Sequence, residues 1–419
     1  MTPLRRRVVL TGLGVIAPNG STLDTFWSSI RTGRSAAGLL TRFPANDAPV
    51  RVACEVRDFL PGDHMDPKIA RRLDRSIQYG VAAAKNAVRD ANLDISALAP
   101  DRVGIAEGTT VSNNETAARA DEAWKKRGYR GISLFAMING YSGGGSGEIA
   151  IELGVHGHAI TLSSGSASGN DVMGYALSMV QNDEADVMVA GGAEAPIIPQ
   201  IWGTFCQGKV MTRFTGDPRE AMKPFDAERS GFVLGEGAGF VVMEELSHAL
   251  ARGARIYAEV LGHGRACEAY HPVAPDPSGL GVYQAAQRAL ARGGVSAGEV
   301  DYVNAHGTAT EANDVVETKA LKQLFGKDAY RIGVSSTKPV TGHLMAAAGA
   351  IETVVSALAV HHQVIPPTAN LRRPDPACDL DYVPTSPRPY PIRVALNLSS
   401  GFGGKNSCLA LRRWSPKSP

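Results

Sequence analysis

The chain lacks the features that define several protein classes. Its five cysteines, an odd number with no C-x-x-C pair, are Cys54, Cys206, Cys267, Cys378 and Cys408. Such scattered thiols exclude a disulfide framework and a zinc-finger site, and they are typical of a reducing, cytoplasmic compartment. No apolar run approaches the roughly 18 to 20 residues that a membrane helix needs. We therefore expect a cytoplasmic protein with no membrane segment.

An excess of charge is missing as well. Lys and Arg total 43 against 41 for Asp and Glu, which leaves a formal net charge of +2. No global field then favours nucleic acid or a membrane surface, and an anionic partner would need a local basic patch. The histidines outside the motifs below, among them His156, His158 and the pair His361–His362, have no metal-ligand spacing. We interpret these four as structural or surface residues and expect no metal.

What the chain does have is a regular alternation of two patterns. Short runs rich in Val and Ile, such as RVVLTGLGVI and DVMVAGGAE, alternate with helical stretches such as SIQYGVAAAKNAVRDANL. This alternation predicts an α/β fold with a largely buried sheet. Both halves end on a glycine-rich turn followed by an apolar strand, which indicates an internal duplication. We place the two units at residues 1–255 and 256–419.

The segment AITLSSGSASGNDVMGYALSMVQND (159–183) predicts an apolar strand that turns abruptly into an amphipathic helix, with Ser166 at the corner. A side chain there lies at the positive end of the helix dipole, beside backbone N–H groups that have no helical partner. A nucleophile at this corner could be acylated, and the resulting oxyanion would meet donors. Asn170 and Asp171 fall in the first turn, where short polar side chains suit free N–H groups. Taken alone, however, a serine at such a position is most often a helix cap.

Three later segments add chemistry to this corner. VNAHGTATEAND (303–314) carries His306 in a polar turn after a strand, and GVSSTKPVTGHLMAAAGAIE (333–352) carries Lys338 and His343 at another strand-to-helix turn. The glycine turn SGFGGKN (400–406) contains Phe402 and lets backbone N–H groups approach a substrate closely. Each segment by itself could be a structural turn.

Together these segments resemble the β-ketoacyl synthase family, specifically its two-histidine group in type II fatty-acid and polyketide systems. The resemblance covers nearly the whole chain and includes KPFDAERSGFVLGEGAG (223–239). It implies a thiolase-type fold, in which duplicated α/β halves form a five-layered α-β-α-β-α arrangement. It also implies a tight dimer, either a homodimer or a heterodimer with a chain-length-factor-like subunit. The substrates would be acyl and malonyl groups on the phosphopantetheine of acyl carrier protein, with no other cofactor.

The same resemblance implies a role for each motif residue. Position 166 would be the nucleophile, and His306 and His343 would hydrogen-bond the malonyl thioester carbonyl and stabilise the developing enolate. Lys338 would orient these neighbours, with Glu317 as its charge partner. The backbone N–H groups of residues 166 and 402 would form the oxyanion hole, and Phe402 would gate the acyl pocket.

Acyl carrier protein is acidic, so a basic docking patch is expected. In DPKIARRLDRSIQYG (66–80), Lys68, Arg71 and Arg72 match the family's docking positions, and Lys209 matches another. A second basic cluster, on an expected surface loop, comprises Lys125, Lys126 and Arg127. The alternative interpretation of either cluster is a solvated helix face.

The chain departs from the family pattern at its most important position, because the family has cysteine where this chain has Ser166. A helix dipole contributes at most about 2 kcal/mol, roughly 1.5 pKa units, which brings a thiol from about 8.5 to near neutrality. A hydroxyl starts several units higher and would need His306 or His343 as a general base. Lys405 also stands where threonine is usual, and Asn170–Asp171 are unusually polar for their helix.

Several functions therefore stay open. The chain could be a serine-substituted form of a condensing enzyme. It could instead be a natural serine acyltransferase or a malonyl-carrier decarboxylase on the same fold. A non-catalytic subunit that binds carrier protein is the third hypothesis, although it would not need His306, His343 and Lys338. Condensation of carrier-bound acyl groups with malonyl-acyl carrier protein is the function that the motifs favour.

Overall fold

The computed structural model describes residues 5–416. Their main sheet has ten strands and consists of two equivalent halves. The first half contains β1 (Val8–Ile16), β4 (Val103–Gly108), β5 (Ala159–Leu162), β6 (Val187–Glu194) and β8 (Gly237–Glu245). The second contains β9 (Ala258–Cys267), β10 (Val300–Asn304), β11 (Gly333–Ser335), β14 (Val394–Gly401) and β15 (Lys405–Arg412).

The strand pairing repeats from one half to the other. Counting outward from the centre, β1-β8-β6-β4-β5 and β9-β15-β14-β10-β11 each show two antiparallel pairs followed by two parallel pairs. A short antiparallel pairing of residues 8–10 with residues 258–260 joins the halves. The expected internal duplication is thus confirmed in the topology.

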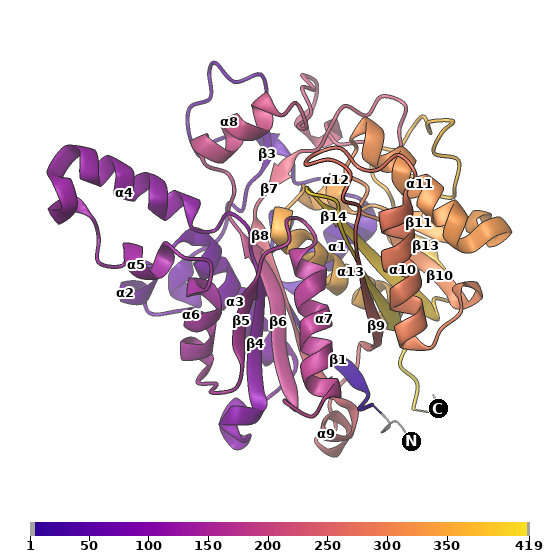
Figure 1. Cartoon of the computed structure of the whole chain (residues 1–419), viewed down its shortest axis with the longest axis horizontal. Coiled ribbons are helices and arrows are strands. Elements are labelled where there is room, and N and C mark those ends of the chain that lie inside the picture. The colour runs from indigo at the N-terminus through magenta and orange to yellow at the C-terminus, as the bar shows by residue number, and fades with distance from the viewer. Residues whose placement is uncertain (1–4, 417–419) are drawn as a thin grey trace.

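Helices complete the five layers (Figure 1). The first half is covered on its outer face by α3 (Arg75–Asp90) and α6 (Gly144–Leu153), and the second by α10 (Leu280–Gly293) and α11 (Glu311–Phe325). Between the two halves lie α7 (Ser168–Gln181) and α13 (Ala348–His362), which contact strands of both. The thiolase-type, five-layered fold is therefore confirmed.

Equivalent glycines let each outer helix approach its strand. A Cβ atom on Gly14 of β1 would lie 2.0 Å from the carbonyl oxygen of Ala83 in α3. A Cβ atom on Gly264 of β9 would lie 2.0 Å from the carbonyl oxygen of Ala285 in α10. Real Cβ atoms do not tolerate such distances, so glycine at both positions permits the close packing of the outer layers.

The central helix corrects one expectation. The helical stretch Met345–His362 has 18 residues with a mean hydropathy of 1.2, so it is long and apolar enough to cross a membrane. In the fold, 89% of it is buried between the two halves of the sheet. A helix that is apolar all round is also what a core layer flanked by two sheets requires, and that is where this helix lies.

The remaining elements lie around the five layers. The helices are α1 (Leu23–Thr32), α2 (Pro67–Ala70), α4 (Asn114–Arg127), α5 (Ala136–Asn139), α8 (Pro199–Gln207), α9 (Leu246–Ala251) and α12 (Lys338–Thr341). The strands form two small sheets, β2 (Gly38–Leu39), β3 (Val52–Cys54) and β7 (Leu234–Gly235), and β12 (Val364–Ile365) with β13 (Arg388–Pro389). The division at residues 255 and 256 falls between α9 and β9 and stays a prediction.

The second basic cluster lies on a helix, not on the loop that we expected. Lys125, Lys126 and Arg127 form the last turn of α4. Cations are favourable there because the carboxyl end of a helix dipole is negative. Lys125 also pairs with Asp121 one turn earlier, at 2.6 Å. Local helix signals therefore explain this cluster without a binding partner.

Candidate active site

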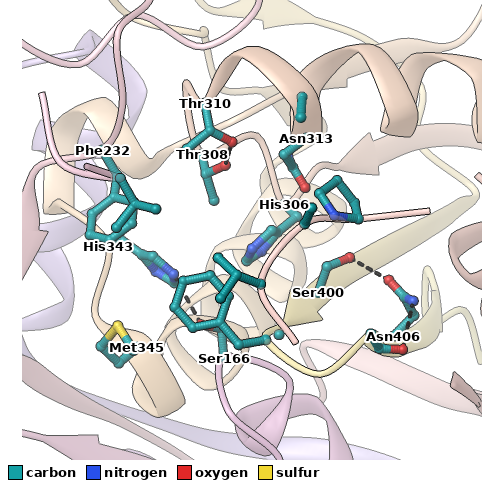
Figure 2. A pocket seen from close by; sticks show the side chains of 18 of the residues that line it. Ser166, Phe232, His306, Thr308, Thr310, Asn313, His343, Met345, Ser400 and Asn406 are labelled. Atoms are coloured by element: carbon teal, nitrogen blue, oxygen red, sulfur yellow. Dashed lines mark hydrogen bonds between the residues drawn. The ribbon is translucent and has the colours of Figure 1, made fainter. Parts of the chain in front are cut away.

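Ser166, His306 and His343 point into one cavity between the two halves (Figure 2). The cavity has a volume of about 200 Å³ and is lined by all three side chains and by Phe402. Ser166 comes from the corner before α7, His306 from the turn after β10, and His343 from the turn after α12. The fold thus brings together three side chains that lie 140 and 37 positions apart in the sequence.

Ser166 sits on a tight turn at the amino end of α7. Gly165 has φ of +68°, a left-handed conformation that favours glycine. The Ser168 hydroxyl accepts from the Ser164 N–H at 2.8 Å and donates to the Gly165 carbonyl at 2.7 Å. The Ser166 Oγ lies 3.0 Å from His343 Nε2, and the residue is 6% exposed. The corner therefore holds the hydroxyl against an imidazole at the dipole's positive end.

His306 is fixed through its backbone and through its ring. The two carboxylate oxygens of Glu317 accept the N–H groups of His306 at 2.6 Å and Gly307 at 2.9 Å. The Lys338 Nζ lies 3.4 Å from His306 Nδ1, and an ammonium can only donate. His306 Nδ1 is then the acceptor, which leaves the ring proton on Nε2.

The charge partner of Lys338 is Glu352, not Glu317. The Lys338 Nζ lies 2.5 Å from Glu352 Oε1, and both residues are at most 2% exposed. Glu317 is engaged with backbone N–H groups instead, so the expected pairing is wrong. Burial raises the pKa of Glu352 to about 7, and the ammonium of Lys338 opposes that rise. The sequence could have indicated Glu352, because it is a lone carboxylate in the apolar run GAIETVVSALAV.

Both histidines are neutral at physiological pH. Burial, followed by the positive charge of Lys338, lowers the pKa of His306 and of His343 well below the usual value. Their rings meet edge to face, with centroids 5.4 Å apart. Among residues 5–416, no group hydrogen-bonds the buried His343 Nδ1. Without a carboxylate at this atom, the imidazolium form of His343 is not stabilised, unlike the histidine of a Ser-His-Asp triad.

This electrostatic pattern suits the stabilisation of negative charge better than the removal of a proton. A neutral imidazole can donate a hydrogen bond to an oxyanion, and the Lys338 ammonium adds a positive potential behind the rings. The same charge disfavours protonation of His343, so the Ser166 hydroxyl has a weak general base. The geometry supports enolate stabilisation directly and serine activation only poorly.

The glycine turn with Phe402 faces the nucleophile corner. A Cβ atom on Gly401 would lie 3.0 Å from the Ser166 nitrogen, and one on Gly165 would lie 3.6 Å from the Phe402 nitrogen. The two backbone segments are therefore in contact. The Phe402 side chain is 43% exposed, and its ring centroid lies 6.4 Å from that of Phe205, also in the cavity wall.

Asn170 and Asp171 do not cap their helix, contrary to expectation. The N-cap of α7 is Ala167, which has no side-chain capping bond. Asn170 exchanges two hydrogen bonds of 2.9 Å with Asn397 of β14, donating to its carbonyl and accepting from its amide. Asp171 accepts from the hydroxyls of Ser164 and Ser407. Both side chains instead join the first half of the protein to the second.

The expected docking residues lie on the surface, outside the cavity wall. Lys68 is in α2, and Arg71 and Arg72 follow it, all three exposed. The Arg72 guanidinium lies 4.9 Å from the centre of the Phe135 ring. Lys209 is exposed just after α8, next to the cavity residue Val210. The structure thus groups three of the four around α2 and places the fourth just after α8, next in the sequence to a residue that lines the cavity.

Comparison with known proteins identifies the fold and the motifs. Residues 5–249 match the model of the β-ketoacyl synthase N-terminal domain, and residues 257–372 match that of the C-terminal domain. The chain belongs to the β-ketoacyl synthase family. It is 42% identical over 410 residues to 3-oxoacyl-[acyl-carrier-protein] synthase 2 of Synechocystis sp.. The aligned residues cover 98% of this chain and 99% of the relative. The enzyme of the same name from Coxiella burnetii is 40% identical with the same coverage.

Solved ketosynthases share the architecture over the same extent. One is the ketosynthase of the AntDE:AntF assembly, a type II polyketide synthase acyl-carrier protein in complex with its ketosynthase bound to the hexaketide. The other is the ishigamide ketosynthase/chain length factor. Both have a TM-score of 0.91, with 32% and 37% identity, and both alignments cover 98% of this chain and 100% of the other. Ketosynthase motifs thus converge here on a site whose corner carries the hydroxyl of Ser166.

Proposed function

We propose that this chain is a 3-oxoacyl-acyl carrier protein synthase of a type II fatty-acid or polyketide pathway, with position 166 as the acyl acceptor. The observation that carries the proposal is the convergence of Ser166, His306 and His343 in one cavity, with the buried Lys338–Glu352 pair behind the rings. A nucleophile and two neutral donors are what an acyl transfer followed by an enolate-forming step requires.

In the first half-reaction, the Ser166 Oγ attacks the carbonyl carbon of a carrier-bound acyl thioester. The hydroxyl proton passes to His343 Nε2, 3.0 Å away, and the oxyanion forms beside the N–H groups of residues 166 and 402. The C–S bond then breaks, and the departing pantetheine thiolate takes the proton from His343. An oxygen ester remains on Ser166.

In the second half-reaction, malonyl carrier binds with its thioester carbonyl toward His306 and His343. His343, left with its proton on Nδ1 after the first half-reaction, exchanges it with solvent so that Nε2 carries the proton. The C–C bond to the carboxylate then breaks, CO₂ leaves, and the electron pair of that bond forms an enolate that the Nε2–H groups of His306 and His343 stabilise. The enolate carbon attacks the ester carbonyl on Ser166. The C–O bond to Ser166 then breaks, the serine oxygen takes a proton supplied by solvent, and the 3-oxoacyl carrier is the product.

A second candidate is malonyl-carrier decarboxylation without condensation. The observation that favours it is the weakness of His343 as a base, since the pKa of this residue is lowered and its Nδ1 meets no carboxylate among the described residues. Decarboxylation needs only the two imidazole donors, whereas acylation also needs an activated hydroxyl. In that case the enolate takes a proton and acetyl carrier is released.

Intact-mass spectrometry with acyl and malonyl carrier proteins tests both candidates. If the serine form gains the acyl mass and the 3-oxoacyl carrier appears, serine-based condensation is supported. If only a Ser166→Cys variant does so, the residues around position 166 are those of a cysteine enzyme. Conversion of malonyl to acetyl carrier by the serine form, lost in His306→Ala, supports decarboxylation. Absence of all three reactions contradicts a catalytic function.

We also propose a dimer, either a homodimer or a heterodimer with a chain-length-factor-like subunit. Within residues 5–416, β5 pairs with β4 on one side and is an open edge on the other. The segment from α4 to α6, of which α6 contacts β5, exposes large apolar side chains, namely Trp124, Tyr129, Leu134, Met137, Tyr141 and Ile151. Open edges and apolar patches of this kind are usually covered by another chain. Native mass spectrometry, alone and with a candidate partner, distinguishes the two assemblies.

For docking of acyl carrier protein, we propose the exposed cations Lys68, Arg71, Arg72 and Lys209, because a carrier is acidic and the chain's net charge is near zero. The unpaired state of all five cysteines supports a reducing, cytoplasmic setting. Phosphopantetheine would arrive on the carrier.

A further inference from the structure

We propose that Asp171 is a positioning residue that holds together the two backbone segments forming the oxyanion hole, with Ser164, Ser407 and His263 as its partners. This inference rests on the proposed function, because it assigns the residues that shape the acyl-transfer part of that site. It also assigns a role to Asp171, whose side chain neither caps α7 nor lines the cavity.

The carboxylate of Asp171 bridges two parts of the chain. Its Oδ2 accepts from the Ser164 hydroxyl at 2.6 Å, two residues before Ser166. Its Oδ1 accepts from the Ser407 hydroxyl at 2.8 Å, in the strand that follows the Phe402 turn. Residues 171 and 407 are separated by 236 positions in the sequence, so this contact joins the two halves of the fold.

Those two parts carry the two N–H groups of the oxyanion hole. Ser164 belongs to the turn that presents the Ser166 nitrogen, and Ser407 lies opposite Ser399 in the hairpin whose tip carries Phe402. At the tip, Gly401 is so close to the corner that a Cβ atom there would lie 2.9 Å from the Ser164 carbonyl oxygen. Contact between the two backbones limits how closely these segments approach each other. The hydrogen bonds of the Asp171 carboxylate to Ser164 and Ser407 fix the position of one segment relative to the other.

His263 of β9 completes the cluster. Its Nε2 lies 2.8 Å from the Ser407 Oγ and 3.4 Å from Asp171 Oδ1. Since the Ser407 hydroxyl donates to Asp171, it accepts from His263, and the donors all point toward the carboxylate. Gly174, one turn after Asp171 in α7, makes room for the ring, because a Cβ atom there would lie 1.9 Å from His263 Nδ1.

The two half-reactions depend on different donors, which gives the proposal a specific test. Acyl transfer uses the oxyanion hole of residues 166 and 402, whereas malonyl decarboxylation uses His306 and His343. An Asp171→Asn change keeps the size of the side chain but replaces one acceptor oxygen with a donor. We expect the acylation rate to fall about tenfold to a hundredfold, since misplacement by about 1 Å can cost that much. Malonyl decarboxylation should stay within about twofold.

The experiment measures both rates for the full-length protein, in whichever of the Ser166 and Ser166→Cys forms is acylated faster. Ser407→Ala and Gly174→Ala should also slow acylation while malonyl decarboxylation stays nearly unchanged. Gly174→Ala would do so by displacing His263 without changing any polar group. A double-mutant cycle of Asp171→Asn with Ser407→Ala should be non-additive. Ser178→Ala is the matched control, because this exposed serine on the same helix bonds only its own helix, at the Gly174 carbonyl.

The outcomes separate this inference from the proposed function. If Asp171→Asn lowers both rates in proportion, the residue is merely structural and the proposal is wrong. Unchanged acylation in all three variants overturns it equally, while the ketosynthase function stands. If the parent protein is acylated in neither form, the proposed function fails and the positioning role fails with it.

Discussion

The buried pair Lys338–Glu352 gives the most discriminating prediction about this site. A Glu352→Gln change keeps an oxygen that can accept from the Lys338 Nζ, now 2.5 Å from Glu352 Oε1, but removes the negative charge. The ammonium would then be buried without a counter-charge. We therefore expect lower stability and a disturbed contact between Lys338 and His306 Nδ1, which lie 3.4 Å apart.

The magnitude follows from the burial of both partners. Removing one member of a buried ion pair costs about 3–5 kcal/mol, because the remaining charge has lost its solvation and its partner. For 419 residues unfolding as one unit, with about 2.1 cal/mol/K of unfolding entropy per residue, the loss corresponds to a fall in Tm of about 3 to 6 °C. Malonyl decarboxylation should fall at least about tenfold, since His306 loses its orienting donor.

Differential scanning calorimetry and release of CO₂ from malonyl carrier measure the two effects. Glu317→Gln is the matched control, because Glu317 accepts backbone N–H groups and does not balance the Lys338 charge at contact distance. It should shift the His306 turn but cost less stability than Glu352→Gln. Equal losses in the two variants, or an unchanged Tm in Glu352→Gln, would refute the assignment of Glu352 as the charge partner.

Three further predictions concern other parts of the molecule. Burial, and then the charge of Glu194, raise the pKa of Glu107 from 4.5 to about 8, so the folded state holds a proton that the unfolded chain releases, and stability falls as pH rises from about 4.5 to 8. Glu107→Gln should remove this loss. Urea unfolding at pH 5.5 and 8.5 should show that the free energy of unfolding of the variant, relative to that of the parent, is a few kcal/mol higher at pH 8.5 than at pH 5.5. Charge reversal at Lys68 and Arg71 together should raise KM for acyl carrier about tenfold at low salt with kcat unchanged, and the difference should shrink in steady-state assays at high salt. Asn170→Ala should cost about 1–3 kcal/mol in chemical denaturation because it removes both buried hydrogen bonds between Asn170 and Asn397, and a variant as stable as the parent would contradict this.

Much of the fold could be predicted because its signals are local. The alternation of Val- and Ile-rich runs with helical stretches predicts an α/β fold, and the strand-to-helix corner at Ser166 is visible in the spacing of Val172, Met173 and Ala176. Local signals were also misread in places. The cluster Lys125–Arg127 was expected on a loop but forms the last turn of α4. The stretch Met345–His362 is longer and more apolar than we expected of any run, because a core helix between two sheets needs no polar face.

The sequence by itself determined the chemical groups of this protein: a nucleophile position at a helix start, two histidines, a lysine and a glycine turn, each recognisable in its own segment. Tertiary structure alone decided how these groups are held. Lys338 pairs with Glu352 because the helix that carries Glu352 is buried against the site, while Glu317 turns to the backbone of the His306 loop. Asp171 reaches Ser407 across 236 positions because α7 lies between the two halves of the sheet. Side-chain spacing encodes contacts along a helix or strand, but partners across layers depend on how the layers pack.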